Sequence, residues 1–129
     1  FMQMITDHGI YDDRVHTVKG FYDQSLTKEL GNQMVQKQSK AMLVNIDCDL
    51  YESAVPVFDF LEPFLQEGTV IYIDDFFPGY KGQVNKGVAR AFLEFQKKSK
   101  WFFERFMDIG WWGRSYIVQT EKRAIEGTV

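Results

Sequence analysis

Two apolar segments, each followed by acidic residues, decide the fold of this chain. Residues 41–49 read A-M-L-V-N-I-D-C-D, and residues 69–75 read T-V-I-Y-I-D-D. A short and nearly continuous apolar run is typical of a strand that is buried on both faces, as in parallel sheets. We therefore predict strands over Ala41–Ile46 and Thr69–Ile73.

The residues between these strands predict a helix. Ser53 is a candidate N-cap, and apolar residues follow it at helical spacing as far as Leu65. Pro56 falls in the first turn of such a helix, and Pro63 should shorten its last turn. Strand, helix and strand joined by short loops make a βαβ unit with a right-handed crossover.

The flanking segments extend this unit on both sides. Val15–Lys19 alternates and is rich in β-branched residues, which predicts a short strand, and Leu26–Gln38 predicts a surface helix. A further amphipathic helix is expected around residues 88–95. Strands over Trp101–Met107 and Ser115–Gln119 flank a Gly-Trp-Trp-Gly turn, so we expect them to pair as an antiparallel hairpin.

We accordingly expect one α/β domain over residues 1–129. Its sheet should be Rossmann-like and mainly parallel, with helices on both faces and the antiparallel hairpin at the C-terminal edge. Residues 1–10 predict the end of a helix with Gly9 as its cap, and residues 11–14 predict a polar turn. Residues 121–129 predict a flexible tail.

Composition narrows the functional classes. The 129 residues are 45% hydrophobic and carry a net charge of −3 with scattered basic residues, which argues against nucleic acid as a partner. No apolar run reaches the length of a membrane span, and no signal-peptide pattern opens the sequence. The single cysteine, Cys48, suits a reducing compartment. We expect a cytoplasmic protein without a membrane partner.

The acidic residues after the two central strands form the first candidate site. Parallel neighbouring strands would bring Asp47, Asp49, Asp74 and Asp75 to one rim of the sheet, where ligands bind in open α/β folds. Clustered carboxylates repel one another, and a hard divalent cation such as Mg²⁺ is their natural partner. The structural alternative stays open, because any single acid here could cap a helix or simply face solvent.

Competing chemistries find less support. A strand that ends in Asp-Asp also occurs in P-loop ATPases, but the sequence has no G-x-x-x-x-G-K-[ST] loop. Nucleophilic catalysis by Cys48 would need a base, and only His8 and His16 are available, neither with an evident link to it. We interpret Cys48 as a small buried side chain.

Aromatic residues form the second candidate site. Gly20, Phe21 and Tyr22 follow the first predicted strand; the rings could stack on a purine and the glycine could admit a ligand, although core packing is the alternative. Trp111 and Trp112 could wall a substrate pocket, pack at the hairpin tip or form an interface.

Three stretches together resemble the macrocin O-methyltransferase family of class I methyltransferases. They are D-R-V-H-T-V-K-G-F-Y-D-Q-S-L (13–26), I-D-C-D-L-Y-E-S-A (46–54) and G-T-V-I-Y-I-D-D (68–75). The resemblance extends from about Gly9 to Phe95. It implies O-methyl transfer from S-adenosylmethionine to a hydroxylated small molecule, a class that includes sugars.

The resemblance also implies roles for individual residues. Mg²⁺ would be held at the catalytic centre by Asp47, Asp74 and Asp75, with Asp49 as a less expected fourth participant. Adenine would contact the loop formed by Gly20, Phe21 and Tyr22. A general base is not identified.

One part of the family pattern is missing. The glycine-rich loop after the family's first strand and the acid after its second have no counterpart before Val15. We therefore expect a C-terminal portion of the methyltransferase fold that lacks the first two strands, binds cofactor weakly and exposes an unpaired edge beside Ala41–Ile46. The alternative function is a non-catalytic α/β interaction or structural module. The sequence leaves the oligomeric state open, a homo-oligomer included.

Overall fold

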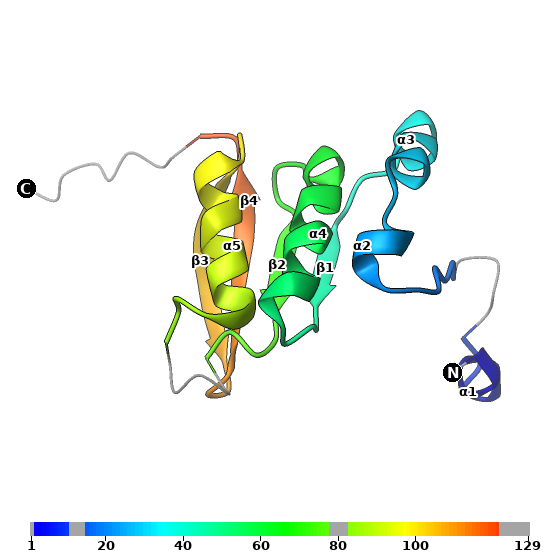
Figure 1. Cartoon of the computed structure of the whole chain (residues 1–129), viewed down its shortest axis with the longest axis horizontal. Coiled ribbons are helices and arrows are strands. Elements are labelled where there is room, and N and C mark those ends of the chain that lie inside the picture. Colours follow the sequence, from blue (N-terminus) through cyan, green and yellow to red (C-terminus); the bar gives the residue numbers. More distant parts are fainter. Residues whose placement is uncertain (1, 11–14, 78–82, 122–129) are drawn as a thin grey trace, which may run out of the picture.

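The computed structural model describes residues 2–10, 15–77 and 83–121, in which three helices precede the first strand and two consecutive strands come last (Figure 1). The elements are α1 (Met2–Asp7), α2 (Tyr22–Ser25), α3 (Lys28–Gln36), β1 (Leu43–Ile46), α4 (Tyr51–Leu61), η2 (Glu62–Phe64), β2 (Val70–Ile73), α5 (Gly87–Lys98), β3 (Phe102–Ile109) and β4 (Gly113–Gln119). The turn predicted at 11–14, the loop residues 78–82 and the predicted tail beyond Glu121 lie outside the described residues.

The strands form one four-stranded sheet in the order β1-β2-β4-β3. β1 and β2 are parallel, with Leu43 opposite Val70, as the βαβ prediction requires. β4 is antiparallel to β2 and also to β3, so the predicted C-terminal hairpin is confirmed. The sheet is therefore mixed.

The prediction of a mainly parallel sheet needs a correction. β4 is antiparallel to both of its neighbours, and the other three strands therefore all run in one direction. Only one pair of adjacent strands in the described sheet, β1 and β2, is parallel. The hairpin is the cause: its second strand folds back and lies between β2 and β3. The carboxyl ends of β1, β2 and β3 consequently share one rim of the sheet.

The prediction of helices on both faces is wrong for the described residues. α4 and α5 lie side by side in front of the sheet in Figure 1 and pack against each other. The β1–α4–β2 and β2–α5–β3 connections both advance in the same direction across the sheet. Crossovers of one hand then place both helices on the same face.

The predicted strand at Val15–Lys19 does not form. These residues carry no strand assignment, and a short helix, α2, follows them. An alternating sequence gives a local preference for extended backbone, but a strand also needs a neighbouring ladder. The predicted helix beyond Leu26 is confirmed as α3, whose first turn is capped by the Thr27 hydroxyl accepting from the Leu30 amide.

The helix between the parallel strands begins earlier than predicted. α4 starts at Tyr51 with Leu50 at the N-cap position, so Ser53 lies inside the helix and is not its cap. Pro56 consequently falls within the helix rather than in its first turn. Pro63 acts as predicted: the α-helix ends at Leu61 and continues as a 3₁₀ turn, η2.

The core lies between the sheet and the two long helices, and aromatic rings fill much of it. Phe58 of α4 stacks on Phe95 of α5 with ring centroids 5.4 Å apart. Phe92 of α5 meets Tyr116 of β4 at 4.4 Å. Ile71 and Ile73, fully buried, supply the sheet side. None of the helices in the described ranges is long and apolar enough to cross a membrane.

Candidate active site

The parallel pairing of β1 and β2 brings the two acidic segments together. The Asp74 amide donates to the Ile46 carbonyl at 2.9 Å, so the ladder continues past the last paired residues of the strands. Asp47 follows Ile46 directly, and Asp75 follows Asp74. The predicted convergence of carboxylates at one rim therefore has a direct backbone cause.

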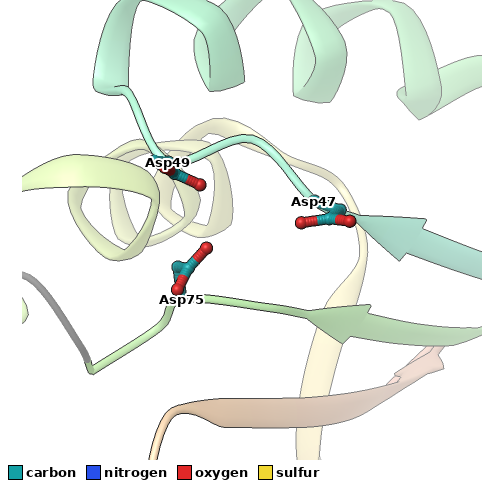
Figure 2. A group of neighbouring side chains, drawn as sticks. All are labelled: Asp47, Asp49 and Asp75. Carbon is teal, nitrogen blue, oxygen red and sulfur yellow. The ribbon is translucent and has the colours of Figure 1, made fainter.

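Three carboxylates point toward a common space at this rim, as Figure 2 shows. One oxygen each from Asp47, Asp49 and Asp75 lies within 4.8 Å of the others. Asp47 and Asp49 come from the loop between β1 and α4 and are exposed, whereas Asp75 follows β2 and is half-buried. We call these three residues the acidic cluster.

Asp74 takes a different position. Its carboxylate accepts a hydrogen bond of 2.7 Å from the Tyr72 hydroxyl, two residues earlier in the chain. Residues i and i+2 of a strand lie on one side of the sheet, which places Asp74 on the side of Tyr72. Among the residues that the sequence suggested as ligands, the structure thus groups Asp47 and Asp75 with Asp49.

The backbone at Asp75 explains why the neighbouring acids separate. Asp75 has a φ of +50°, a left-handed conformation that aspartate and asparagine adopt more readily than most residues. This conformation ends the strand geometry after Asp74 and turns the next carboxylate toward the loop that carries Asp47 and Asp49.

Electrostatic repulsion marks the acidic cluster. The pKa of the Asp75 carboxyl is raised from 3.8 to about 6, first by a hydrogen bond with Asp49, then by burial and by the charges of Asp49, Asp74 and Asp47. The cluster consequently favours bound positive charge, either a proton or a cation.

Cys48 lies between two members of the cluster but is poorly suited to nucleophilic chemistry. Burial, followed by the charges of Asp49 and Asp47, raises the pKa of its thiol from 9.0 to about 11. The side chain packs partly buried against the core. At neutral pH the thiol stays protonated, which agrees with its interpretation as a packing residue.

A groove of about 460 Å³ lies between the segment around α2 and the first turn of α4, the helix that follows Asp49 in the chain. Its lining includes Gly20, Phe21 and Tyr22, the three residues that the resemblance assigned to adenine. Phe21 is 77% exposed, so its ring is available for stacking. Gly20 has a φ of +140°, and a Cβ there would lie 3.2 Å from that of Ser25.

Sequence reasoning missed two kinds of residue here. Glu52 and Ser53 line the groove from the first turn of α4, although the sequence suggested only a capping role for Ser53. Glu52 and Ser53 follow Asp49 closely in the D-L-Y-E-S segment, and this nearness to a candidate ligand is a signal that could have indicated them. Tyr72, which binds Asp74, had no such signal beyond its position two residues before the acid.

These residues lie within a segment that matches a known protein family. The model of the family described as Macrocin-O-methyltransferase (TylF) matches residues 2–116, which is most of the chain and includes both the acidic cluster and the groove. The chain belongs to the macrocin O-methyltransferase family. No curated protein matches it.

Membership of the macrocin O-methyltransferase family identifies the chain with methyltransferases in general. The match extends past Phe95, where the resemblance in the sequence ended, and reaches Tyr116 in β4. The hairpin and the turn at residues 110–112 are therefore part of the family pattern as well.

Proposed function

We propose that the chain takes part in S-adenosylmethionine-dependent, divalent-metal-assisted methyl transfer to a hydroxyl group of a small molecule. The observation that carries the proposal is the convergence of Asp47, Asp49 and Asp75 at the ends of two adjacent parallel strands. The groove of about 460 Å³ has the size of small-molecule sites. Family membership supports the methyl-transfer chemistry.

The acidic cluster fits a hard divalent cation. Its three donors are all carboxylate oxygens, the ligand type that Mg²⁺ prefers. The pKa of Asp75 is raised by its hydrogen bond with Asp49, by burial and by the neighbouring charges, which supports the proposal that this carboxyl group favours a positive partner. When bound, Mg²⁺ supplies a Lewis acid that lowers the pKa of an acceptor hydroxyl. Asp74, predicted as one of the three ligands, stays a predicted ligand although it accepts from Tyr72, and Asp49 joins the cluster more closely than the sequence suggested.

The groove fits the adenosine end of the methyl donor. Phe21 and Tyr22 offer ring faces for stacking, and Gly20 leaves room for close approach to the backbone. The residues of the groove and the cluster orient the two reactants at one rim, and orientation of this kind contributes about 7–11 kcal/mol in well-ordered systems.

A titration of Mg²⁺ followed by calorimetry and thermal melting tests the metal. We expect saturable binding and a raised Tm, both lost in Asp47→Asn and in Asp75→Asn. Asp59→Asn removes one carboxylate from α4, where Asp59 pairs with Lys98, and serves as the control that keeps the metal response. Equal responses from all four chains would refute the metal proposal.

A parallel titration with S-adenosylmethionine tests the groove. We expect weak binding that falls further in Phe21→Ala, because the exposed ring supplies stacking area. Micromolar binding by the monomeric chain would contradict the expectation of weak binding.

A second candidate, a non-catalytic interaction module, has one observation in its favour. β1 is an edge strand of the described sheet. Its first residue, Leu43, is 70% exposed, and Met42, which directly precedes the strand, is 78% exposed. Exposed apolar residues at a sheet edge are suited to pairing with another polypeptide. A chain indifferent to Mg²⁺ and to S-adenosylmethionine, but stabilised by a partner, would favour this candidate.

A further inference from the structure

The turn between β3 and β4 lies at the same rim as the acidic cluster. β3 runs in the direction of β1 and β2, so its end at Ile109 shares their carboxyl-end rim, as Figure 1 shows. The Phe77 amide, two residues after Asp75, donates to the Trp112 carbonyl at 3.0 Å. A backbone hydrogen bond thus ties the turn to the loop that follows the cluster.

Side-chain packing gives a second link between the turn and the acids. A Cβ added at Gly113 would lie only 2.4 Å from the Tyr72 hydroxyl oxygen. The same hydroxyl donates to Asp74 at 2.7 Å. The backbone after Trp112 therefore contacts a side chain that is itself bonded to an acid of the rim.

The base of the turn is held firmly. Arg114 pairs with Asp108 at 2.7 Å, and its side chain is only 18% exposed. Its guanidinium also lies 4.9 Å from the ring of Phe76 and 4.7 Å from the ring of Phe77. These contacts fix the turn to the loop after β2.

The two tryptophans of this anchored turn remain in solvent. Trp111 is 73% exposed and Trp112 is 40% exposed, with ring centroids 4.6 Å apart and planes tilted by 58°. Packing at the hairpin tip, one of the roles open from the sequence, leaves much of their area uncovered in the described structure. Small-molecule sites are lined largely by apolar and aromatic side chains together with a few polar groups.

We propose that Trp111 and Trp112 form an aromatic platform for the ring of the methyl acceptor, a six-membered ring that carries neighbouring hydroxyl groups. This inference rests on the proposed function, in which the acidic cluster handles the hydroxyls through a metal. The negative face of an indole attracts the C–H bonds of a saturated ring and also stacks on an aromatic one. A pyranose and a catechol share this chemistry.

Nuclear magnetic resonance of the ¹⁵N-labelled 129-residue chain with Mg²⁺ tests the platform. The chain has three tryptophans, so its indole N–H signals are readily assigned by substitution with phenylalanine. The probes are methyl α-D-mannopyranoside and catechol. We expect one of them to shift the signals of Trp111 and Trp112 and to leave that of Trp101, at the opposite end of β3, in place.

Variants define the size of the effect. Trp111→Ala should weaken binding of the shifting probe roughly three- to tenfold, the range of one aromatic contact. Trp101→Phe, the matched control, should leave the affinity unchanged. The probe that shifts the signals decides between a saturated and an aromatic acceptor.

Several results would overturn the platform. One is the absence of indole shifts with either ring up to about 50 mM, which covers millimolar affinities. Another is a probe affinity that falls in Asp75→Asn but not in Trp111→Ala; the metal proposal would then stand without the platform. Indole shifts that depend on protein concentration and not on probe would assign the rings to an interface with a second copy.

A different result would separate the platform from the metal. Probe binding that is lost in Trp111→Ala but is unaffected by Asp75→Asn and by Mg²⁺ would support the platform and refute the metal proposal.

Discussion

Replacing Asp75 with asparagine should stabilise the metal-free chain at neutral pH. The substitution keeps the shape of the side chain, and asparagine tolerates the φ of +50° at this position. It removes one negative charge from a group whose oxygens from Asp47, Asp49 and Asp75 lie within 4.8 Å of one another. Loss of this repulsion favours the folded state, in which the charges are held together.

The pKa of Asp75 sets the size of the gain. A rise from 3.8 to about 6 corresponds, at 1.36 kcal/mol per pKa unit, to about 3 kcal/mol as an upper bound. The carboxyl is partly exposed and shares protons with Asp49, so screening and coupling reduce the gain to about 1 kcal/mol. A domain of this length should then show a Tm higher by roughly 3–5 °C.

The gain should depend on pH with a defined sign. Below the ordinary pKa of 3.8 the carboxyl is protonated in both the folded and the unfolded chain, and the substitution changes little. Between 3.8 and about 6 the folded wild-type chain binds more protons than the unfolded chain, so its stability falls as pH rises. The advantage of asparagine should therefore develop across this interval and be complete at pH 7.

Thermal melting at pH 4 and pH 7, with and without Mg²⁺, measures these effects. We expect Asp75→Asn to melt higher than the wild type at pH 7 without metal and to lose the gain that Mg²⁺ gives the wild type. Asp59→Asn, outside the cluster, should show neither change. An unchanged or lowered Tm at pH 7, or an equal gain at both pH values, would refute the reasoning.

Three further variants and reactions test the fold around the site. Gly113→Ala should lower the free energy of unfolding by about 1–3 kcal/mol through overpacking, because the added Cβ meets the Tyr72 ring and disturbs its hydrogen bond to Asp74. Urea unfolding measures this loss, and an unchanged midpoint would contradict the close contact. Phe92→Ala should lower the free energy of unfolding by about 3–5 kcal/mol, because the Phe92 ring is fully buried among other rings. Calorimetry measures this loss, and a value below about 1 kcal/mol would argue against the aromatic core. Cys48 should react slowly with iodoacetamide at pH 8 because its thiol pKa is about 11, and the urea-unfolded chain should react faster; equal rates would contradict the raised pKa.

Local patterns in the sequence predicted the elements that hold the site. The apolar runs before Asp47 and Asp74 became β1 and β2, because short apolar runs rich in β-branched residues favour strands. The prediction of burial on both faces is wrong for β1, which lies at an edge of the described sheet and leaves Leu43 exposed. The Gly-Trp-Trp-Gly turn predicted the hairpin. Both predictions, of the two strands and of the hairpin, rest on residues that are close together in the sequence.

Predictions failed where a distant partner decides the outcome. Val15–Lys19 has the alternation of a strand, but no ladder pairs with it among the described residues. The start of α4 at Tyr51 was missed because Ser53 is a good cap in isolation, whereas the helix begins after Leu50 without a side-chain cap. The handedness of both crossovers, which no residue type encodes, placed α4 and α5 on one face.

The sequence by itself determined that acids follow two apolar strands, and the parallel pairing expected for these strands brings carboxylates to one rim. Only the tertiary structure decided which of them meet: a left-handed backbone at Asp75 and the Tyr72 hydroxyl separate Asp75 from Asp74, while the loop after β1 brings Asp49 into the group. The physical reason is that the position of a strand follows from a local run of apolar residues, which the sequence reveals. The direction of each side chain follows from dihedral angles and hydrogen bonds that form only after the segments have packed.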